Sequence, residues 1–276
     1  MSSLRPLNAR SLVLSVLLGL DPPVLPTRAL IDVAALFGIA SGTMRTALSR
    51  MVAAGELVVE GAGYRLVGRL LERKSAQDIG RRPAPSAWDG SWVLAVVTSE
   101  RRTIAERRSF RTHMGNLRMG ELRPDTWMRP ANLPGPDGAP GIAVVRGGLT
   151  GADPTELAQR LWDLPAVSAG AELLREQVAA MLPALHDHRA EALAPAITLA
   201  AEVVRFLRAE PLLPPTLTPH PWPPDALRTA YATFDKHLGR TLHHLTHSTT
   251  SPTEVNEVAR NAASVRSGRS RPTTGR

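Results

Sequence analysis

The sequence predicts an α+β protein of several domains, and three observations lead to that prediction. Helical hydrophobic spacing followed by two short strand patterns occupies the first 69 residues, a continuous apolar run opens a second unit near residue 88, and long helical patterns dominate from residue 151. With 276 residues, 43% of them hydrophobic and 21% charged, the chain can form more than one packed core.

These patterns divide the chain into five segments. The last segment is rich in Ser, Thr and Arg and poor in apolar residues, so we expect it to be a disordered basic tail. The segments are an N-terminal domain at residues 1–69, a linker at 70–87, a middle domain at 88–150, a helical domain at 151–246 and the tail at 247–276.

The apolar run from Ser11 to Leu20 predicts a buried first helix. Two arginines precede the run, as they would in a signal peptide, but it is far too short to span a membrane and prolines follow it where a cleavage site would need small residues. We therefore favour the buried helix. The absence of cysteine excludes disulfides and thiolate metal sites and fits a cytoplasmic protein.

The helix expected after Ser41 has one apolar face and one polar face. Its apolar residues follow helical spacing and are Met44, Ala47, Leu48, Met51 and Val52. Hydroxyls and guanidiniums occupy the opposite face, and both suit phosphates and the acceptor edge of guanine. The residues of this face are Thr43, Arg45, Thr46, Ser49 and Arg50.

A helix from Thr27, a turn at Gly38 and this second helix precede two strands at 56–59 and 64–67. Thr27 and Ser41 are the expected N-caps. A glycine-bearing loop joins the strands. Helix, turn, helix and hairpin form the layout of a winged helix-turn-helix DNA reader, in which Tyr64 and Arg65 would lie on the wing.

Residues 70–87 turn polar and basic, which predicts a short helix followed by a linker. We favour a solvated connector here, although Arg81 and Arg82 could also form an arm that contacts phosphate.

The middle segment predicts a small ferredoxin-like sheet. The apolar run from Trp92 to Val97 is typical of a central strand, and a helix, two short strands and a later strand follow it. The segment at 131–141 holds too many Pro and Gly residues for a helix and is expected to be a loop. The expected helix is Ile104–Leu117, and the later strands lie within 117–122, 126–130 and 141–147.

The third segment predicts a helical domain. A proline-rich extended stretch separates its last two helices, and Pro195 is expected to kink the third. The expected helices are Asp153–Leu164, Val167–Leu182, His186–Ala209 and Pro224–Leu245.

Charge is distributed unevenly along the chain, whose total is +8. Residues 1–87 carry +5, residues 88–150 carry +3, residues 151–250 carry −3 and residues 251–276 carry +3. Since 31 of the 33 basic residues are arginine, codon composition accounts for part of the excess. The positive charge of the first two segments suits an acidic partner such as DNA.

No pattern in the sequence indicates a catalytic or cofactor site: it has no nucleophile elbow, phosphate loop, dinucleotide fingerprint or zinc ribbon. His243 and His247 have a spacing that can hold zinc, but the intervening glutamate of metalloproteases is missing, so surface histidines are favoured over a metal site. Each of the five tryptophans, taken alone, suits packing in a core better than contact with a ligand.

Taken together, the chain resembles the PaaX family, the transcriptional repressors of phenylacetic acid catabolism and their relatives. Five blocks carry the resemblance in the family's order. They are TMRTALSRMVAAGELV at 43–58, WDGSWVLAVV at 88–97, LRPDTWMRPANL at 122–133, LAQRLWDL at 157–164 and FLRAEPLLPPTLTPHPWPP at 206–224.

The resemblance implies a homodimer that binds double-stranded operator DNA and releases it on binding an effector such as phenylacetyl-CoA or a related acyl-CoA. The candidate effector contacts are Trp127, Arg129, Trp162 and Trp222, which lie in the last three blocks. The chain lacks the tyrosine that family members carry shortly after the WDL motif, and its loop at 131–141 is unusually rich in Pro and Gly. These departures put the identity of the effector in doubt more than DNA binding.

Two alternatives remain beside a transcriptional regulator that is not an enzyme, has no cofactor and does not enter a membrane. One is a metal-dependent nuclease that uses the middle sheet, which would need a carboxylate at the end of its first strand. There, Val97 is followed by Thr98 and Ser99, and the first acid is Glu100. The other alternative is a protein that binds nucleic acid without sequence preference, to which the basic tail would contribute.

Overall fold

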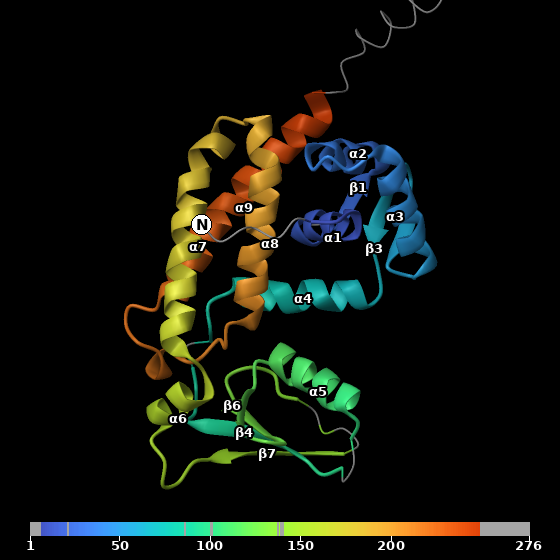
Figure 1. The fold of residues 1–276 in the computed structure, drawn as a ribbon. Helices are drawn as coiled ribbons and strands as arrows, with labels where there is room; N and C mark the ends of the chain where they lie inside the picture. The colour runs from blue at the N-terminus through green and yellow to red at the C-terminus, as the bar shows by residue number, and fades with distance from the viewer. Residues whose placement is uncertain are drawn as a thin grey trace, which may run out of the picture.

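The computed structural model describes residues 7–20, 22–85, 87–99, 102–136, 138 and 141–248. In this part of the chain, helices combine with two antiparallel sheets, one of three strands and one of four, which confirms the predicted α+β class (Figure 1). The last helix ends at Ser248, and the rest of the expected tail lies outside the described residues.

The N-terminal unit consists of three helices and the three-stranded sheet. The sheet has the order β1-β3-β2, so the third strand in sequence is central. The elements are α1 (Ala9–Gly19), β1 (Val24–Pro26), α2 (Thr27–Leu36), α3 (Ser41–Ala53), β2 (Leu57–Glu60) and β3 (Gly63–Leu66). All the helices and the hairpin match the sequence prediction to within two or three residues at each end, and the run in α1 is buried as expected.

The structure differs from the prediction where α2 and α3 begin. Strand β1 was not predicted, because it is three residues long and lies among prolines. Thr27 does not cap α2: its hydroxyl donates a hydrogen bond of 2.9 Å to the carbonyl of Ala62 in the hairpin turn. Ser41 does not cap α3 either, since Ala40 occupies the N-cap position without a side-chain hydrogen bond.

Helix α4 (Arg69–Arg81) is longer than the short helix expected at the start of residues 70–87 and occupies most of what was expected to be a solvated connector. It packs against α8, and Figure 1 shows it lying between the N-terminal unit and the four-stranded sheet. Arg81 is half-buried and forms an ion pair with Asp235, at 3.3 Å. Arg81 therefore has a structural role, since its ion pair helps to fix α4 against the C-terminal helices.

The middle unit is the four-stranded antiparallel sheet with one helix. Its order is β5-β6-β4-β7, and the first strand in sequence, β4, lies inside the sheet as its apolar run predicted. Along β4 the side chains alternate between two clusters, with Trp92 on one face and Val93 on the other. The elements are β4 (Ser91–Val97), α5 (Ile104–Asn116), β5 (Gly120–Arg123), β6 (Thr126–Pro130) and β7 (Ile142–Gly148).

The C-terminal unit is helical, as predicted, with different boundaries. Pro195 lies in the first turn of α8, where its missing N–H has no partner to lose, so the expected kink is absent and a short 3-10 turn precedes the helix. The elements are α6 (Pro154–Leu161), α7 (Leu164–His186), the 3-10 turn Ala190–Ala192, α8 (Leu193–Ala209), the 3-10 turn Pro215–Leu217 and α9 (Pro223–Ser248).

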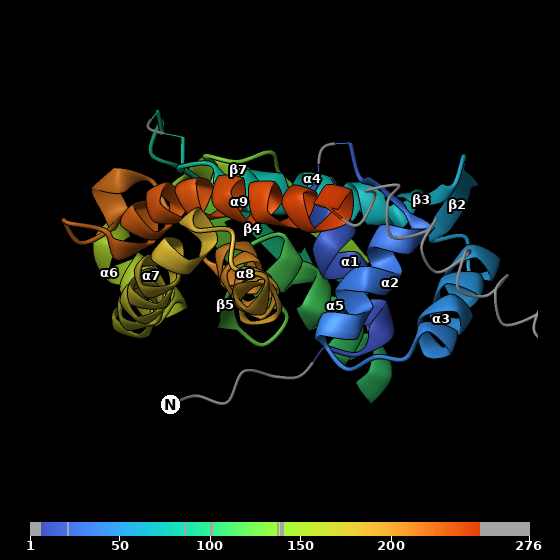
Figure 2. The ribbon, with the colours of Figure 1, turned by 90° about the horizontal axis from the view of Figure 1, so that it is seen from above.

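The hydrophobic cores do not follow the three expected units. One continuous core joins α1, α2 and α3 to α7, α8 and α9, and includes both Leu17 of α1 and Val203 of α8. The sheet contributes two smaller cores, one beneath α5 and one beneath α6 and the segment that follows α8. Figure 2 shows α9 crossing α8 and reaching α2, so the N-terminal unit packs directly on the C-terminal helices.

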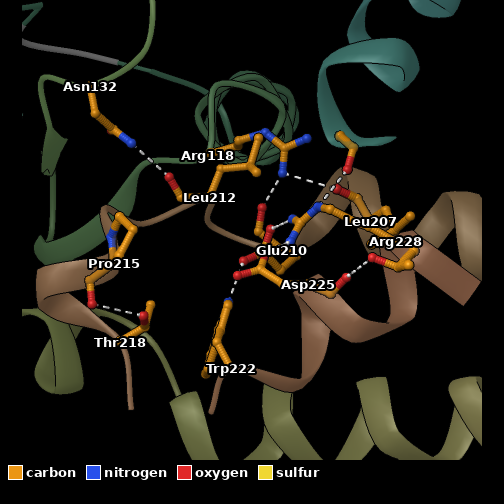
Figure 3. A network of polar contacts seen from close by, with 12 residues as sticks. Arg118, Asn132, Leu207, Glu210, Leu212, Pro215, Thr218, Trp222, Asp225 and Arg228 are labelled. Atoms are coloured by element: carbon orange, nitrogen blue, oxygen red, sulfur yellow. Dashed lines mark hydrogen bonds and ion pairs between the residues drawn. The ribbon is translucent and has the colours of Figure 1, made fainter. Parts of the chain in front are cut away.

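A buried polar network joins the three units (Figure 3). Its centre is the carboxylate of Glu210, just after α8, whose side chain has no exposed surface. Arg228 of α9, with 4% of its side chain exposed, forms an ion pair with this carboxylate and donates a hydrogen bond of 3.0 Å to the carbonyl of Gly80 in α4. The indole N–H of Trp222 donates to the other carboxylate oxygen, at 3.4 Å.

The middle unit enters the network through Arg118, which follows α5. Its guanidinium donates hydrogen bonds to the carbonyl oxygens of Leu207, at 3.0 Å, and of Glu210. Burial lowers the pKa of Arg118 to about 10, although the Glu210 carboxylate opposes that shift, so the side chain stays cationic at neutral pH. A single cluster of charges therefore fixes α4, the sheet and α9 relative to one another.

We expect Gly80→Ala to destabilise the protein by about 1–3 kcal/mol, the usual cost of overpacking. The added Cβ would lie 2.6 Å from the Leu207 carbonyl oxygen and 2.9 Å from the Arg118 guanidinium. Gly115→Ala is the matched control, because Gly115 is also the penultimate residue of its helix and a Cβ there meets nothing within 4 Å. The control should gain up to about 1 kcal/mol. Urea unfolding measures both, and equal effects would contradict a tight contact at Gly80.

Glu210→Gln should lower the free energy of unfolding by about 3 kcal/mol or more, because it leaves the buried Arg228 without its counter-charge. Glu202→Gln provides the comparison, since Glu202 pairs with an exposed Arg205 at 3.4 Å and exposed pairs contribute less than about 1 kcal/mol. Denaturant titrations of the two variants test the difference. A loss below 1 kcal/mol for Glu210→Gln would show that the network does not hold the units together.

Candidate nucleic-acid interface

Helix α3 presents the polar face that its sequence predicted. Met44, Leu48 and Met51 are buried in the large core. Every predicted contact residue on the opposite face is exposed: Thr43, Arg45, Thr46, Ser49 and Arg50. Figures 1 and 2 both place α3 at an edge of the molecule, on the side away from α7, so the packed helices leave this face open.

Two unpaired arginines distinguish this face from the rest of the N-terminal unit. The described part of residues 7–68 holds five arginines. Three of them have acidic partners in the same unit: Arg10 with Glu56, Arg28 with Asp32 and Arg65 with Glu60. By contrast, Arg45 and Arg50 form no ion pair with any described residue. Their guanidiniums are therefore available for an anionic partner.

The hydroxyl of Thr46 has an internal partner, since it donates a hydrogen bond of 2.9 Å to the carbonyl of Gly42 one turn earlier. Its lone pairs stay on the exposed face of α3 as acceptors. Thr43 and Ser49 make no such bond among the described residues and offer free hydroxyls beside the two arginines.

The predicted wing residues have other partners in the structure. Tyr64 lies in the central strand β3 and packs, half-buried, against the large core. Arg65 pairs with Glu60 across the hairpin. Access to a phosphate would therefore require Arg65 to exchange its carboxylate for the new anion, whereas Arg45 and Arg50 need no exchange.

The hairpin turn is fixed by close backbone contacts. A Cβ on Gly63 would lie 2.2 Å from the carbonyl oxygen of Leu25 in β1, so only glycine fits where these strands meet. Thr27 holds the turn from the other side through its two bonds to Ala62. A tight turn of this kind keeps the hairpin at a fixed distance from α2 and α3.

The candidate effector residues do not meet in one place. Trp127 packs against Phe110 on the α5 face of the sheet, with ring centroids 6.3 Å apart. Trp162 and Trp222 belong to the core on the opposite face. Because the sheet separates the two sets, they cannot line a common cavity in this structure.

Arg129, the fourth candidate, binds a loop. Only 2% of its surface is exposed, and its guanidinium donates hydrogen bonds to the carbonyls of Leu133, at 3.1 Å, and Pro134. Burial lowers the pKa of Arg129 to about 10. The side chain thus anchors the start of the predicted Pro- and Gly-rich loop, where prolines supply carbonyl acceptors but no N–H donors.

The structure offers little support for a nuclease site at the end of β4. The end of β4 lies beside Asp125, whose backbone carbonyl accepts a hydrogen bond of 2.9 Å from the N–H of Val97. Arg102 forms an ion pair with the Asp125 carboxylate, so a guanidinium already occupies the position of a cation. Glu100 lies outside the described residues. Across the described part of the chain, no group of three or more His, Asp or Glu side chains could hold a metal ion.

The histidines gather where α7 and α9 meet. The rings of His188 and His244 are tilted to each other, with centroids 4.2 Å apart, and the ring centroids of His186 and His237 are 5.6 Å apart. The side chain of His247 lies outside the described residues, so the structure does not test the zinc-compatible spacing of His243 and His247. Loss of hydration and the positive groups around it lower the pKa of His188.

Comparisons with known proteins agree with the geometry of the N-terminal unit. A family model described as PaaX-like protein matches residues 8–70. A solved structure, described as uncharacterized protein Rv0674 from Mycobacterium tuberculosis, is 37% identical in sequence, with a TM-score of 0.66. The similarity covers 87% of this chain and 99% of that one. No curated protein matches the chain in sequence.

The match to the family model places the chain among proteins that are generally transcriptional regulators. The chain belongs to the PaaX-like family. Within its described helices, none is both long and apolar enough to cross a membrane.

Protonation of His188 should destabilise the protein. Because the folded state lowers its pKa, the unfolded state binds the proton more tightly, so stability is complete above about pH 6.5 and falls as the pH drops below that ordinary imidazole value. His188→Asn should flatten this dependence; Asn tolerates the left-handed backbone here, φ 53°, and can replace the hydrogen bond to Thr241. Melting temperatures between pH 7 and pH 5 test this, with His113→Asn as the control variant. An unchanged pH profile in His188→Asn would contradict the assignment.

Proposed function

We propose that this protein is a sequence-specific DNA-binding transcriptional regulator that reads operator DNA with α3. The observation that carries the proposal is the pair of exposed guanidiniums, Arg45 and Arg50, without acidic partners on a helix whose other face is buried. A guanidinium can bind guanine O6 and N7 in the major groove with two hydrogen bonds, and short hydroxyls beside it suit phosphate.

The order of elements in the N-terminal unit supports a winged helix-turn-helix. Helix α2, a four-residue connection with Gly38 at φ 67°, and α3 would form the helix-turn-helix, and the β2–β3 hairpin the wing. The strand order of the middle sheet suits a ferredoxin-like unit in which the loop at 131–141 replaces the second helix.

By likeness to its family, the protein would act as a homodimeric repressor that a small acidic or aryl-CoA effector releases from DNA. A two-fold dimer would place two α3 helices on half-sites about one helical turn apart, roughly 34–36 Å. The effector would need to bind the form that does not bind the operator more tightly than the form that does, because only a difference in affinity shifts the equilibrium.

Arg45→Ala and Arg50→Ala should each weaken binding to the operator by about 1–3 kcal/mol if the side chain contacts a base. Arg160→Ala is the matched control, since Arg160 is an exposed arginine of α6. Electrophoretic retardation of the protein's own promoter DNA, compared with a scrambled fragment at physiological salt, gives the affinities.

If the arginine contacts only phosphate, its substitution should weaken binding to both fragments equally and make the affinity less dependent on salt. Equal retardation of promoter and scrambled DNA by the wild-type protein would exclude a sequence-specific regulator and leave the protein that binds nucleic acid without sequence preference.

A further inference from the structure

A cavity of about 310 Å³ lies between the N-terminal unit and the C-terminal helices. Its walls come from α1, α8 and α9, and Arg81 at the end of α4 contributes to one end. Figure 1 shows α1 beside α8, with α4 running below α1 to the lower end of α8. The size falls at the lower end of the range for small-molecule sites, about 300–1,000 Å³.

Most of the cavity surface is apolar. Small residues on all three helices leave the space open: Ser15 on α1, Ala200 and Ala201 on α8, and Gly239 on α9. Aliphatic side chains surround much of this space. They include Leu14, Leu18, Ile197, Val204, Leu238 and Leu242.

The polar groups lie together at the end near α4. On α8 the charged lining residues, Arg205 and Arg208, come last in sequence, after the apolar ones. On α9 the polar lining residues come first, and Arg81 contacts them: its guanidinium pairs with Asp235 and donates to the hydroxyl of Tyr231, at 3.3 Å in each case. Since α4 also packs on α8, the cavity has one charged end and one apolar end.

The charged end of the cavity has an excess of positive charge, and one N–H donor of Arg81 has no hydrogen-bond partner among the described residues. Arg208 forms no ion pair with any described residue. The Nε of Arg81 is buried and has no acceptor within the described part of the chain, which is costly for a charged donor. The other arginines that line the cavity already have partners: Arg10 with Glu56 and Arg205 with Glu202.

We propose that this cavity binds a small amphipathic organic anion and that its occupation controls DNA binding. The carboxylate of the ligand would pair with Arg208 at the charged end, and its acyl or aryl body would lie between the aliphatic side chains of α1, α8 and α9. The control of DNA binding rests on the function proposed above, whereas binding of the anion does not.

Helix α1 is the route from the cavity to the DNA reader. It lines the cavity together with α8 and α9, and it packs directly on both α8 and α3. A ligand wedged against Leu14 and Leu18 therefore changes the free energy of any displacement of α1 relative to α8. A ligand that fits the arrangement without operator DNA better than the arrangement with it would weaken DNA binding.

Isothermal titration calorimetry without DNA tests the site, with octanoate and 2-naphthoate as the acyl and aryl probes. We expect one of them to bind one molecule per chain and to raise the melting temperature, whereas octylamine, with the same chain as octanoate and the opposite charge, does neither. Failure of both anions to bind, or equal binding of octylamine, would overturn the proposal.

Two substitutions locate the binding. Gly239→Leu should abolish binding, because the new side chain would fill the cavity. It should not unfold α9, because a Cβ there meets nothing within 4 Å. Gly115→Leu is the matched control on α5, where a Cβ is equally unhindered. Arg208→Gln should weaken binding about tenfold or more, as the loss of a charged hydrogen bond does, and Arg160→Gln should not. Wild-type affinity in both Gly239→Leu and Arg208→Gln, with normal melting curves, would overturn the site.

Retardation of promoter DNA with and without the bound anion tests the control of DNA binding. We expect weaker retardation in the wild-type protein and no change in Gly239→Leu. An anion that binds by calorimetry but leaves retardation unchanged would overturn the regulatory role alone. If promoter and scrambled DNA are retarded equally, the proposed function fails while the calorimetric result for the site stands.

Discussion

The arrangement of the molecule depends on the buried carboxylate of Glu210. It lies where three chain segments meet, and each contributes a donor or an acceptor: Arg228 from α9, Trp222 from the segment before it, and Gly80 from α4 through Arg228. Arg118 adds the middle unit by donating hydrogen bonds to the backbone carbonyls of Leu207 and of Glu210 itself. Charges taken out of water are stable only as a fully partnered set. Partial separation of the units would leave several of these groups unpaired at once, so we expect the units to keep a common arrangement.

A shared hydrophobic core adds to this constraint. The N-terminal unit does not bury its helices by itself, since α1 and α2 complete their packing on α8 and α9. The core therefore connects the exposed face of α3 to the helices that follow the sheet. A change in how α8 meets α1 would reach α3, the proposed DNA reader, through packed side chains, with α4 as a second connection along the backbone.

Local patterns allowed much of the fold to be predicted. The buried and exposed faces of α3 follow from helical spacing alone, and β4 was recognisable from its apolar run because such strands are buried on both faces. Features that depend on distant contacts could not be predicted. Gly80 approaches Leu207, and Arg129 binds a loop, through contacts that form only in the folded chain. The four candidate effector residues lie on opposite faces of a sheet, and the sequence did not assign residues to those faces. The cavity combines three helices far apart in sequence, so no local motif marks it.

The two faces of α3 are open to evolutionary change to very different degrees. Its inner residues, such as Met44 and Leu48, are enclosed in a core shared with helices encoded more than a hundred residues later, so a change in volume there needs a compensating change elsewhere. Its outer residues, including Arg45 and Arg50, touch no part of that core and carry no internal ion pair. If α3 reads DNA as proposed, new sequence preferences can arise through substitutions on this one helix surface, while the scaffold that carries the helix stays the same.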